Sequence, residues 1–468
     1  MPPVPRRGGG RDRRAGGLTL PSETRRTFYG WPMVGIGFLT YGLGIAPAYY
    51  GLGIFASSLI ADLELTRQQI GQMFGAFTFT YGLVSPVAAA VIRRWGIRAT
   101  VTAGALCAAS GFWVVSQASS ATEIYLGYSL VGGIGIGFST LLPAQAMPIF
   151  WFRRYRARAT AIILSGAGVV GFLWPPAAGL VLEAWDWRVG WQIVTGISLL
   201  VAAIAVLFIR NRPSDIGQRR DGLPPQDPDD PTPVGPGRRP ESSVVGSGTE
   251  VAGEPMPKGA LMWALRTPQF WIATFATAAN TVPWRVVSAH GGLHLEDLGF
   301  TTLAASTILG VRVGASLFGR LTGSLGDFMS PMRVLALALL VNAVALWVFV
   351  SASSAAVAYP CVFAIGVAYG TAYTSEVVVF GLFFGRAAFV GTTGIRIGLI
   401  GVIGALGPIL AGAAADRTGS YAGTLWTLGG LAVLGAASIW FCRPPDRPAF
   451  VGQPQAGEYT GPATTQEN

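Results

Sequence analysis

The chain has 468 residues, of which 51% are hydrophobic and only 12% are charged, and its formal net charge is +10. Soluble domains carry roughly 25% charged residues, so this composition excludes a soluble multidomain enzyme and predicts an integral membrane protein. The excess of arginine is expected to set membrane orientation, and no nucleic-acid partner is expected. Cys107, Cys361 and Cys442 stand alone in apolar stretches, so neither a disulfide nor a metal site is predicted.

The chain begins with a polar, arginine-rich segment, residues 1–28, which predicts a disordered N-terminus. The apolar run that follows is too long for a secretory signal and lacks its cleavage site, so we expect it to remain as a first membrane helix. Length and apolarity predict twelve membrane spans. They lie at residues 32–56, 70–92, 99–117, 122–148, 159–183, 190–209, 269–289, 302–325, 333–351, 355–382, 388–414 and 421–441.

A polar, proline-rich segment separates the sixth span from the seventh and is predicted to be a flexible linker at residues 211–266. It divides the chain into two six-helix bundles, at 29–210 and 267–442, followed by a tail at 443–468. Basic residues cluster in alternate loops, together with the linker and both termini, and the positive-inside rule places that side in the cytoplasm. We therefore predict an all-α protein of the bacterial inner or plasma membrane with both termini cytoplasmic.

The two halves of the sequence form a weak internal repeat. A basic turn with Arg93, Arg94, Gly96 and Arg98 follows the second span, and a related turn with Asp327 follows the eighth. Such turns hold helix ends together by charge pairs that a conformational change must break, although a pure orientation signal explains them equally well. The repeat predicts two bundles related by a pseudo-two-fold axis, as in transporters that rock two bundles about a midplane site.

The eighth span carries two arginines. Arg312 lies near its middle, where a charged side chain costs about 2.5–3.5 kcal/mol on insertion scales, so water, a partner or an anion must meet it. Arg320 lies roughly 10 Å of helix rise before Asp327 and can either bind an anion or snorkel to the headgroups. A guanidinium stays charged and offers a carboxylate a planar fork of donors, so either arginine can serve as an anion clamp.

Two further charges lie inside predicted spans. Arg396 in the eleventh span either snorkels or supplies a second positive charge, which suits a dicarboxylate. Glu376 in the tenth span is expected to be a counter-ion for Arg320 or Arg396, or a proton carrier, because an unpaired membrane arginine is costly.

Uncharged or titratable candidates complete the predicted site. His290 lies toward the outer end of the seventh span, beyond Arg285, and is either an interfacial residue or a coupling group that titrates near neutral pH. Tyr49 in the first span and Tyr373 in the tenth can hydrogen-bond a substrate without adding charge, or simply pack between helices.

Several short stretches, spread over both halves, carry a family resemblance: Phe28-Tyr29-Gly30-Trp31, Tyr81-Gly82-Leu83-Val84-Ser85-Pro86, Gly319-Arg320 and Gly407-Pro408. With them the chain resembles the major facilitator superfamily, and within it the monocarboxylate transporters and their relatives that include the oxalate/formate antiporters. The family's loop signature, Gly-x-x-x-Asp-Arg-x-Gly-x-Arg, is matched by Arg94, Gly96 and Arg98, whereas Arg93 replaces the aspartate.

This resemblance implies that an arginine of the eighth helix binds the substrate carboxylate, and Gly319-Arg320 is the dipeptide that matches. Proton-coupled members carry a lysine in the first helix and an aspartate one turn before that arginine. Here the corresponding residues are Pro47-Ala48-Tyr49-Tyr50 and Ser316, so proton symport by that pair is not expected.

Together these features predict a secondary transporter that moves a small organic anion, a mono- or dicarboxylate, by alternating access, with Arg312 or Arg320 as the central clamp. The alternatives are efflux of lipophilic or drug-like compounds, and a membrane sensor or scaffold without transport. An enzyme is not expected, since no nucleophile and base, phosphate loop or soluble domain is present. The expected partners are the bilayer, the anion and a co- or counter-transported ion; no cofactor is expected, and a monomer is favoured.

Overall fold

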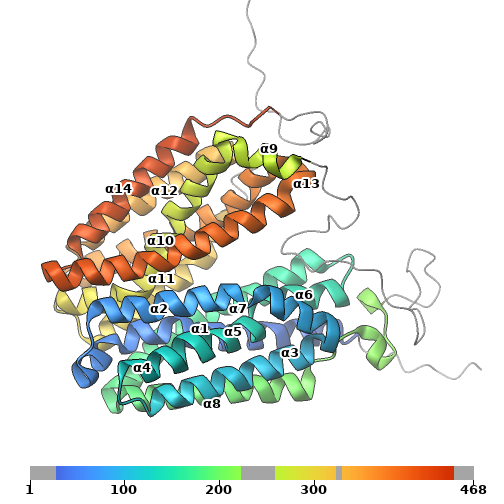
Figure 1. Ribbon diagram of the computed structural model, residues 1–468, viewed down its shortest axis with the longest axis horizontal. Coiled ribbons are helices and arrows are strands. Elements are labelled where there is room, and N and C mark those ends of the chain that lie inside the picture. Colours follow the sequence, from blue (N-terminus) through green and yellow to red (C-terminus); the bar gives the residue numbers. More distant parts are fainter. Residues whose placement is uncertain (1–27, 223–258, 323–328, 447–468) are drawn as a thin grey trace, which may run out of the picture.

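The computed structural model describes residues 28–222, 259–322 and 329–446, and within these ranges the regular secondary structure is entirely helical. The helices form two bundles, one from the N-terminal half and one from the C-terminal half (Figure 1). The predicted all-α fold of two bundles is confirmed.

The N-terminal bundle contains one helix after another with short connections. Its elements are α1 (Gly30–Leu63), α2 (Arg67–Leu83), α3 (Ser85–Ser116), α4 (Ala121–Ile124), the π-helix η1 (Tyr125–Gly132), α5 (Gly133–Ser139), α6 (Leu141–Trp151), α7 (Arg156–Ala184) and α8 (Trp187–Phe208). Two short 3-10 helices follow, η2 (Pro213–Ile216) and η3 (Arg220–Gly222).

The C-terminal bundle begins with a short helix that packs against it. Its elements are α9 (Ala260–Arg266), α10 (Pro268–Asp297), α11 (Thr302–Leu321), α12 (Pro331–Phe349), α13 (Ala355–Thr418) and α14 (Ala422–Trp440). The predicted linker, 211–266, therefore contains helical segments at both ends. The apolar run of α9 explains the difference at its C-terminal end, because Ala260 and Ala264 are fully buried in a cluster with Phe270 and Phe384.

Glycine turns divide α3 and α13. Gly96 has φ +85° and Gly385 has φ +61°, a region of backbone space that residues with a Cβ rarely occupy. Each of these elements therefore reverses direction and contributes to two spans, which gives the described helices six membrane-crossing segments in each bundle. The twelve predicted spans are confirmed, with the first segment of α3 continuing the span that α2 begins.

Ten helical stretches within the described residues are long and apolar enough to cross a membrane. The other two spans start from α2, which has only 17 residues, and α10, which carries Arg285, two histidines and two acids in its second half. The least apolar spans are thus those that bring polar side chains to the boundary between the bundles.

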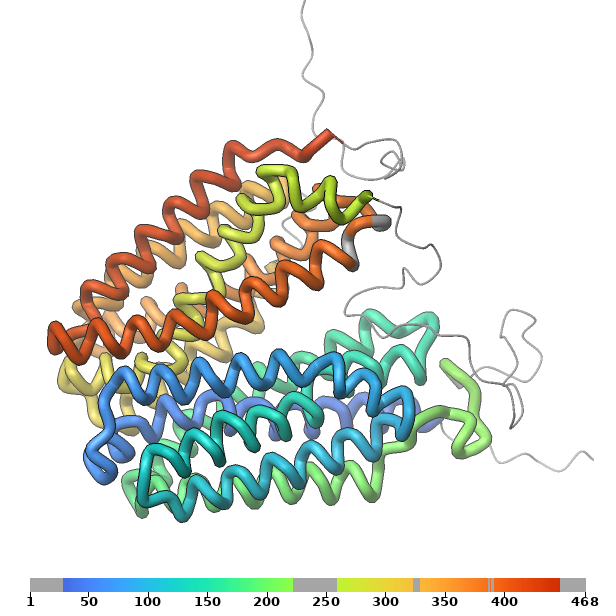
Figure 2. The backbone as a smooth tube through the Cα atoms, in the orientation of Figure 1, coloured from blue at the N-terminus to red at the C-terminus, as the bar shows by residue number. Residues whose placement is uncertain are grey.

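At one end, here named the closed end, the bundles touch through small residues. A Cβ on Gly53 of α1 would clash with the Ser288 carbonyl oxygen of α10, and one on Gly71 of α2 would clash with the Pro408 carbonyl oxygen of α13. Such small-residue contacts let helix backbones approach closely. Toward the opposite end the backbones of the two bundles diverge (Figure 1 and Figure 2).

The opposite end, here named the termini end, gathers the basic loops. The Arg98 amide donates to Asn211 Oδ1 (2.9 Å) just after α8, and the Arg153 and Arg154 amides donate to Asp221 Oδ2 (2.9 and 2.7 Å). The Tyr29 amide donates to Gln218 Oε1 (2.8 Å), which ties the start of α1 to the same region. The assignment of this end to the cytoplasm stays a prediction of the positive-inside rule.

Candidate functional site

Arg312 lies in the middle of α11 and is completely buried, with 0% of its surface exposed. Its Nη1 donates to the Trp284 carbonyl (3.2 Å) and its Nη2 to Ser288 Oγ (2.8 Å), both on α10. The guanidinium carbon lies 4.0 Å from the centroid of the Trp284 ring, within cation–π range. One turn of α10 therefore holds this charge with a ring face, a carbonyl and a hydroxyl.

Arg312 has no acidic counter-ion in the described part of the chain. The ion pairs found there engage Asp62, Asp297 and Glu376 with other arginines, and Arg312 Nε is buried without a hydrogen-bond partner. A buried charge is costly unless it is paired and fully hydrogen-bonded. The site is therefore complementary to an anion that offers acceptor oxygens.

Aromatic side chains from both bundles surround Arg312. The Trp284 ring stacks on Tyr369 of α13, with ring centroids 3.9 Å apart. From the other bundle, Tyr49 and Tyr50 of α1 pack edge to face (5.1 Å), and both lie within electrostatic range of Arg312. A tyrosine hydroxyl can donate a hydrogen bond to an anion without adding charge.

Arg320 lies in the last turn of α11, about 12 Å of helix rise from Arg312 and nearer the termini end. It is half-buried, its Nε is buried without a partner, and its guanidinium carbon lies 5.6 Å from the ring centroid of Tyr373, a residue that is 44% exposed. Tyr50 lies within electrostatic range of both arginines. The fold thus brings both predicted clamps to one group of tyrosines at two depths.

Arg396 and Glu376 form a separate, buried pair inside the C-terminal bundle. Arg396 Nη1 lies 3.6 Å from Glu376 Oε1, and the two side chains are only 6% and 5% exposed. Arg396 also donates to Thr277 Oγ1 (3.3 Å), and its guanidinium carbon lies 4.3 Å from the Phe380 ring centroid. Of the two counter-ion alternatives for Glu376, the geometry has Arg396 as its partner rather than Arg320.

Arg285 is an intramembrane arginine that the sequence analysis left out of the site. Its Nη1 donates to the Gly401 carbonyl (3.3 Å) of α13, and it lies within electrostatic range of Tyr49 and Tyr81 in the other bundle. The sequence feature that could have identified Arg285 as a candidate is its depth in the span. It lies twelve residues, or about 18 Å of helix rise, before the end of α10 at Asp297.

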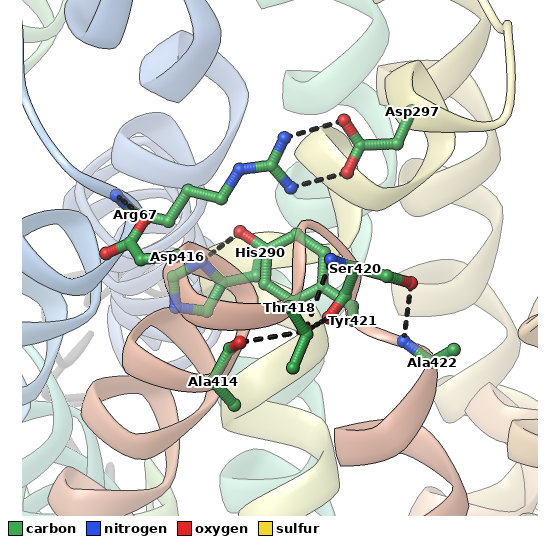
Figure 3. Close-up of polar contacts among 9 residues, drawn as sticks. All are labelled: Arg67, His290, Asp297, Ala414, Asp416, Thr418, Ser420, Tyr421 and Ala422. Carbon is green, nitrogen blue, oxygen red and sulfur yellow. Dashed lines mark hydrogen bonds and ion pairs between the residues drawn. The ribbon is translucent and has the colours of Figure 1, made fainter.

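His290 is buried between helices at the closed end (1% exposed). Its Nδ1 lies 3.1 Å from the Tyr421 hydroxyl (Figure 3). Its Nε2 lies 2.9 Å from the Pro408 carbonyl oxygen. The side chain thus connects α10 to Pro408 inside α13 and to Tyr421, the residue just before α14, and its role as an interfacial or a coupling residue stays a prediction.

Polar contacts join the two bundles at the closed end. Arg67, the first residue of α2, makes a bidentate ion pair with Asp297 at the end of α10, with Nη2 2.7 Å from Oδ1 (Figure 3). Asp416 of α13 accepts hydrogen bonds from the Arg67 and Gln68 amides (2.9 and 2.8 Å), so a carboxylate of one bundle caps a helix of the other. Ser57 donates to Glu296 (3.3 Å) nearby.

The predicted loop motif at the termini end is built differently from a charge latch. Gly96 supplies the positive-φ turn, as the motif requires, but Arg93, Arg94 and Arg98 are exposed and, in the described ranges, have no carboxylate partner. The loop is held instead by Asn211, which accepts from the Arg98 amide. Asp327, the other predicted gate residue, lies outside the described residues.

Two bundles of six spans that meet around a buried arginine, for which the described residues provide no acid, form the architecture of a polytopic membrane transporter. A profile described as Major Facilitator Superfamily matches residues 33–390, and the chain belongs to this superfamily. This confirms the resemblance seen in the sequence.

The relatives and the fold agree. The chain is 26% identical over 418 residues to monocarboxylate transporter 13 of Bos taurus, covering 88% of each chain. It is 27% identical to monocarboxylate transporter 11 of Homo sapiens, covering 93% of this chain and 85% of the relative. The fold is similar to that of a bacterial homolog of the human lysosomal transporter Spinster, with a TM-score of 0.67 and 17% identity over 89% of this chain and 97% of that chain.

Proposed function

We propose that this protein is a secondary transporter that moves a small organic anion with a carboxylate group across a membrane by alternating access, and that Arg312 binds the anion. The observation that carries the proposal is a fully buried arginine for which the described residues provide no carboxylate. The names of the monocarboxylate transporter relatives support the same substrate class.

A carboxylate would complete the hydrogen bonding of Arg312. Its buried Nε and the remaining N–H groups of Nη1 and Nη2 are available, and a guanidinium presents them in a planar fork that matches two carboxylate oxygens. Tyr49 and Tyr50 add neutral donors from the N-terminal bundle. An anion held between them would contact both bundles, as a substrate that drives a bundle rearrangement must.

Arg320 fits a role nearer the termini end, which in this proposal faces the cytoplasm. It is half-buried and lies over the exposed ring of Tyr373, so it would meet an anion before Arg312 does. A partly exposed charge attracts anions at a smaller desolvation cost than a buried one.

Alternating access requires the closed-end contacts to break. Ser288 connects the two regions, since its hydroxyl accepts from Arg312 while its carbonyl oxygen packs against Gly53 of α1 in the other bundle. An anion that draws the Arg312 guanidinium toward itself would therefore act directly on the α1–α10 contact. Proton coupling through the family's lysine and aspartate is not part of the proposal, since Ser316 replaces the aspartate and donates its hydroxyl to the Val313 carbonyl (2.7 Å).

Uptake into proteoliposomes tests the proposal. The purified protein should move radiolabelled mono- or dicarboxylates, and Arg312→Gln should abolish uptake while the variant still expresses and purifies. Arg417→Gln is the matched control, because Arg417 is exposed at the closed end of α13. If the wild-type protein moves none of the carboxylates but moves lipophilic compounds, the efflux alternative replaces the proposal.

A further inference from the structure

We propose that Arg285 is a second anion-binding residue and that the substrate carries two carboxylates, one bound by Arg312 and one by Arg285. The inference rests on the proposed function of the Arg312 site and extends it to a substrate class. Its basis is the placement of a second arginine charge on the same turn of α10 that holds Arg312.

Arg285 packs against two glycines of α13, Gly401 and Gly404. Its guanidinium lies against Gly404, where a Cβ would come within 2.7 Å of Nη1 and 2.8 Å of Cζ, so any larger residue at that position would push the guanidinium aside. Its hydrogen bond to the Gly401 carbonyl uses one of the five N–H groups of the guanidinium. Within the described ranges no carboxylate pairs with it.

Arg285 and Arg312 converge on one part of the bundle boundary. Trp284, the residue directly before Arg285, supplies both the ring and the carbonyl that hold the Arg312 guanidinium. Tyr49 of the N-terminal bundle lies within electrostatic range of both arginines. The charges of Arg285 and Arg312 therefore both lie near Tyr49 and near the turn of α10 that contains Trp284.

The balance of charge favours a dianion. Arg396 is neutralised by Glu376, so the second positive charge that a dicarboxylate needs does not come from Arg396, as the sequence alone allowed. Arg285 and Arg312 together present two charges that no acid of the described residues offsets. A monocarboxylate would pair with only one of the two charges, that of the fully buried Arg312 or that of the half-buried Arg285, whereas a dicarboxylate would pair with both.

The test compares two four-carbon acids, succinate and butyrate, which differ by one carboxylate. Uptake of each is measured in proteoliposomes with the wild type, Arg285→Gln, Arg285→Lys and the exposed control Arg417→Gln. We expect Arg285→Gln to lower succinate uptake by at least about tenfold, because a hydrogen-bonded charge contact is lost, and to leave butyrate uptake nearly unchanged. Arg285→Lys should retain an intermediate succinate rate, because it keeps the charge but loses the fork.

Ligand binding is measured separately, as the rise in unfolding temperature of each purified variant on adding succinate or butyrate. The inference predicts a smaller succinate-induced rise in Arg285→Gln than in the wild type and an equal butyrate-induced rise. It is overturned if Arg285→Gln changes both acids equally or neither, or if the wild type moves butyrate and not succinate. In those cases the proposed anion transport stands; if the wild type neither moves nor binds any carboxylate, both proposals fall.

Discussion

Arg312 and Arg396 are both buried arginines of the C-terminal bundle, and they differ in what faces their charge. Arg396 has a carboxylate 3.6 Å away in Glu376, together with Thr277 and the Phe380 ring. Arg312 has a carbonyl, a hydroxyl and the Trp284 ring, and the described residues give it no carboxylate. A paired charge can serve the structure of the bundle, whereas an unpaired charge is complementary to an anion from outside.

The largest expected effect follows from removing the unpaired charge. Arg312→Gln should lower carboxylate uptake by at least about 30-fold, since truncating one partner of a buried charge pair costs about 2–5 kcal/mol. Stability should be preserved, because no acid is left without a partner. Initial uptake rates and thermal unfolding measure the two effects, with Arg417→Gln as control. If Arg312→Gln takes up carboxylates at the wild-type rate, Arg312 does not differ from Arg396 in its importance for transport.

The next largest effect concerns the paired charge. Glu376→Gln leaves Arg396 buried without a carboxylate and should destabilise the protein by about 3–5 kcal/mol, read as a lower unfolding temperature in detergent. The double variant Glu376→Gln with Arg396→Gln should recover most of that loss, because neither charge remains. A Glu376→Gln protein of normal stability that no longer transports would instead identify Glu376 as a proton carrier.

A smaller effect is expected at Arg320, which shares tyrosine neighbours with Arg312 but is half-buried. Arg320→Gln should reduce uptake by less than Arg312→Gln does, because water already screens part of its charge. Concentration dependence of uptake separates a raised KM from a lowered kcat. A loss equal to or greater than that of Arg312→Gln would make Arg320, the residue that the family resemblance favours, the principal anion-binding residue.

The smallest effect is expected for an ion pair that water reaches. Arg67 and Asp297, which join the bundles, are 24% and 35% exposed, and exposed pairs contribute about 0.2–1 kcal/mol. Arg67→Gln should therefore open the closed end only slightly, by up to about fivefold in the rate at which a thiol reagent labels a cysteine introduced at Ser57. Arg188→Gln is the control, because its pair with Asp62 lies within one bundle. Equal labelling in both variants would mean that Arg67 does not hold the closed end.

The sequence predicted the transmembrane fold because hydropathy, span length and loop charge are local properties of the chain. The twelve spans and the six-plus-six division follow from them, and the depth of Arg312 in an apolar helix can be read without a structure. The superfamily was recognised from short motifs spread over both halves. The glycine of the turn at Gly96 was likewise readable from its motif.

Only the tertiary structure decided which groups the intramembrane arginines and His290 contact. Arg312 meets residues 24 and 28 positions away, Arg285 meets a carbonyl 116 positions away, and His290 meets Pro408 and Tyr421 at 118 and 131 positions. Span order does not say which faces of two helices meet, so Glu376 could not be assigned to Arg396 over Arg320 from the chain alone. Contact between helix faces is set by the packing of the whole bundle, and that packing gives Arg396 a carboxylate partner while the described residues offer none to Arg312, Arg285 or Arg320.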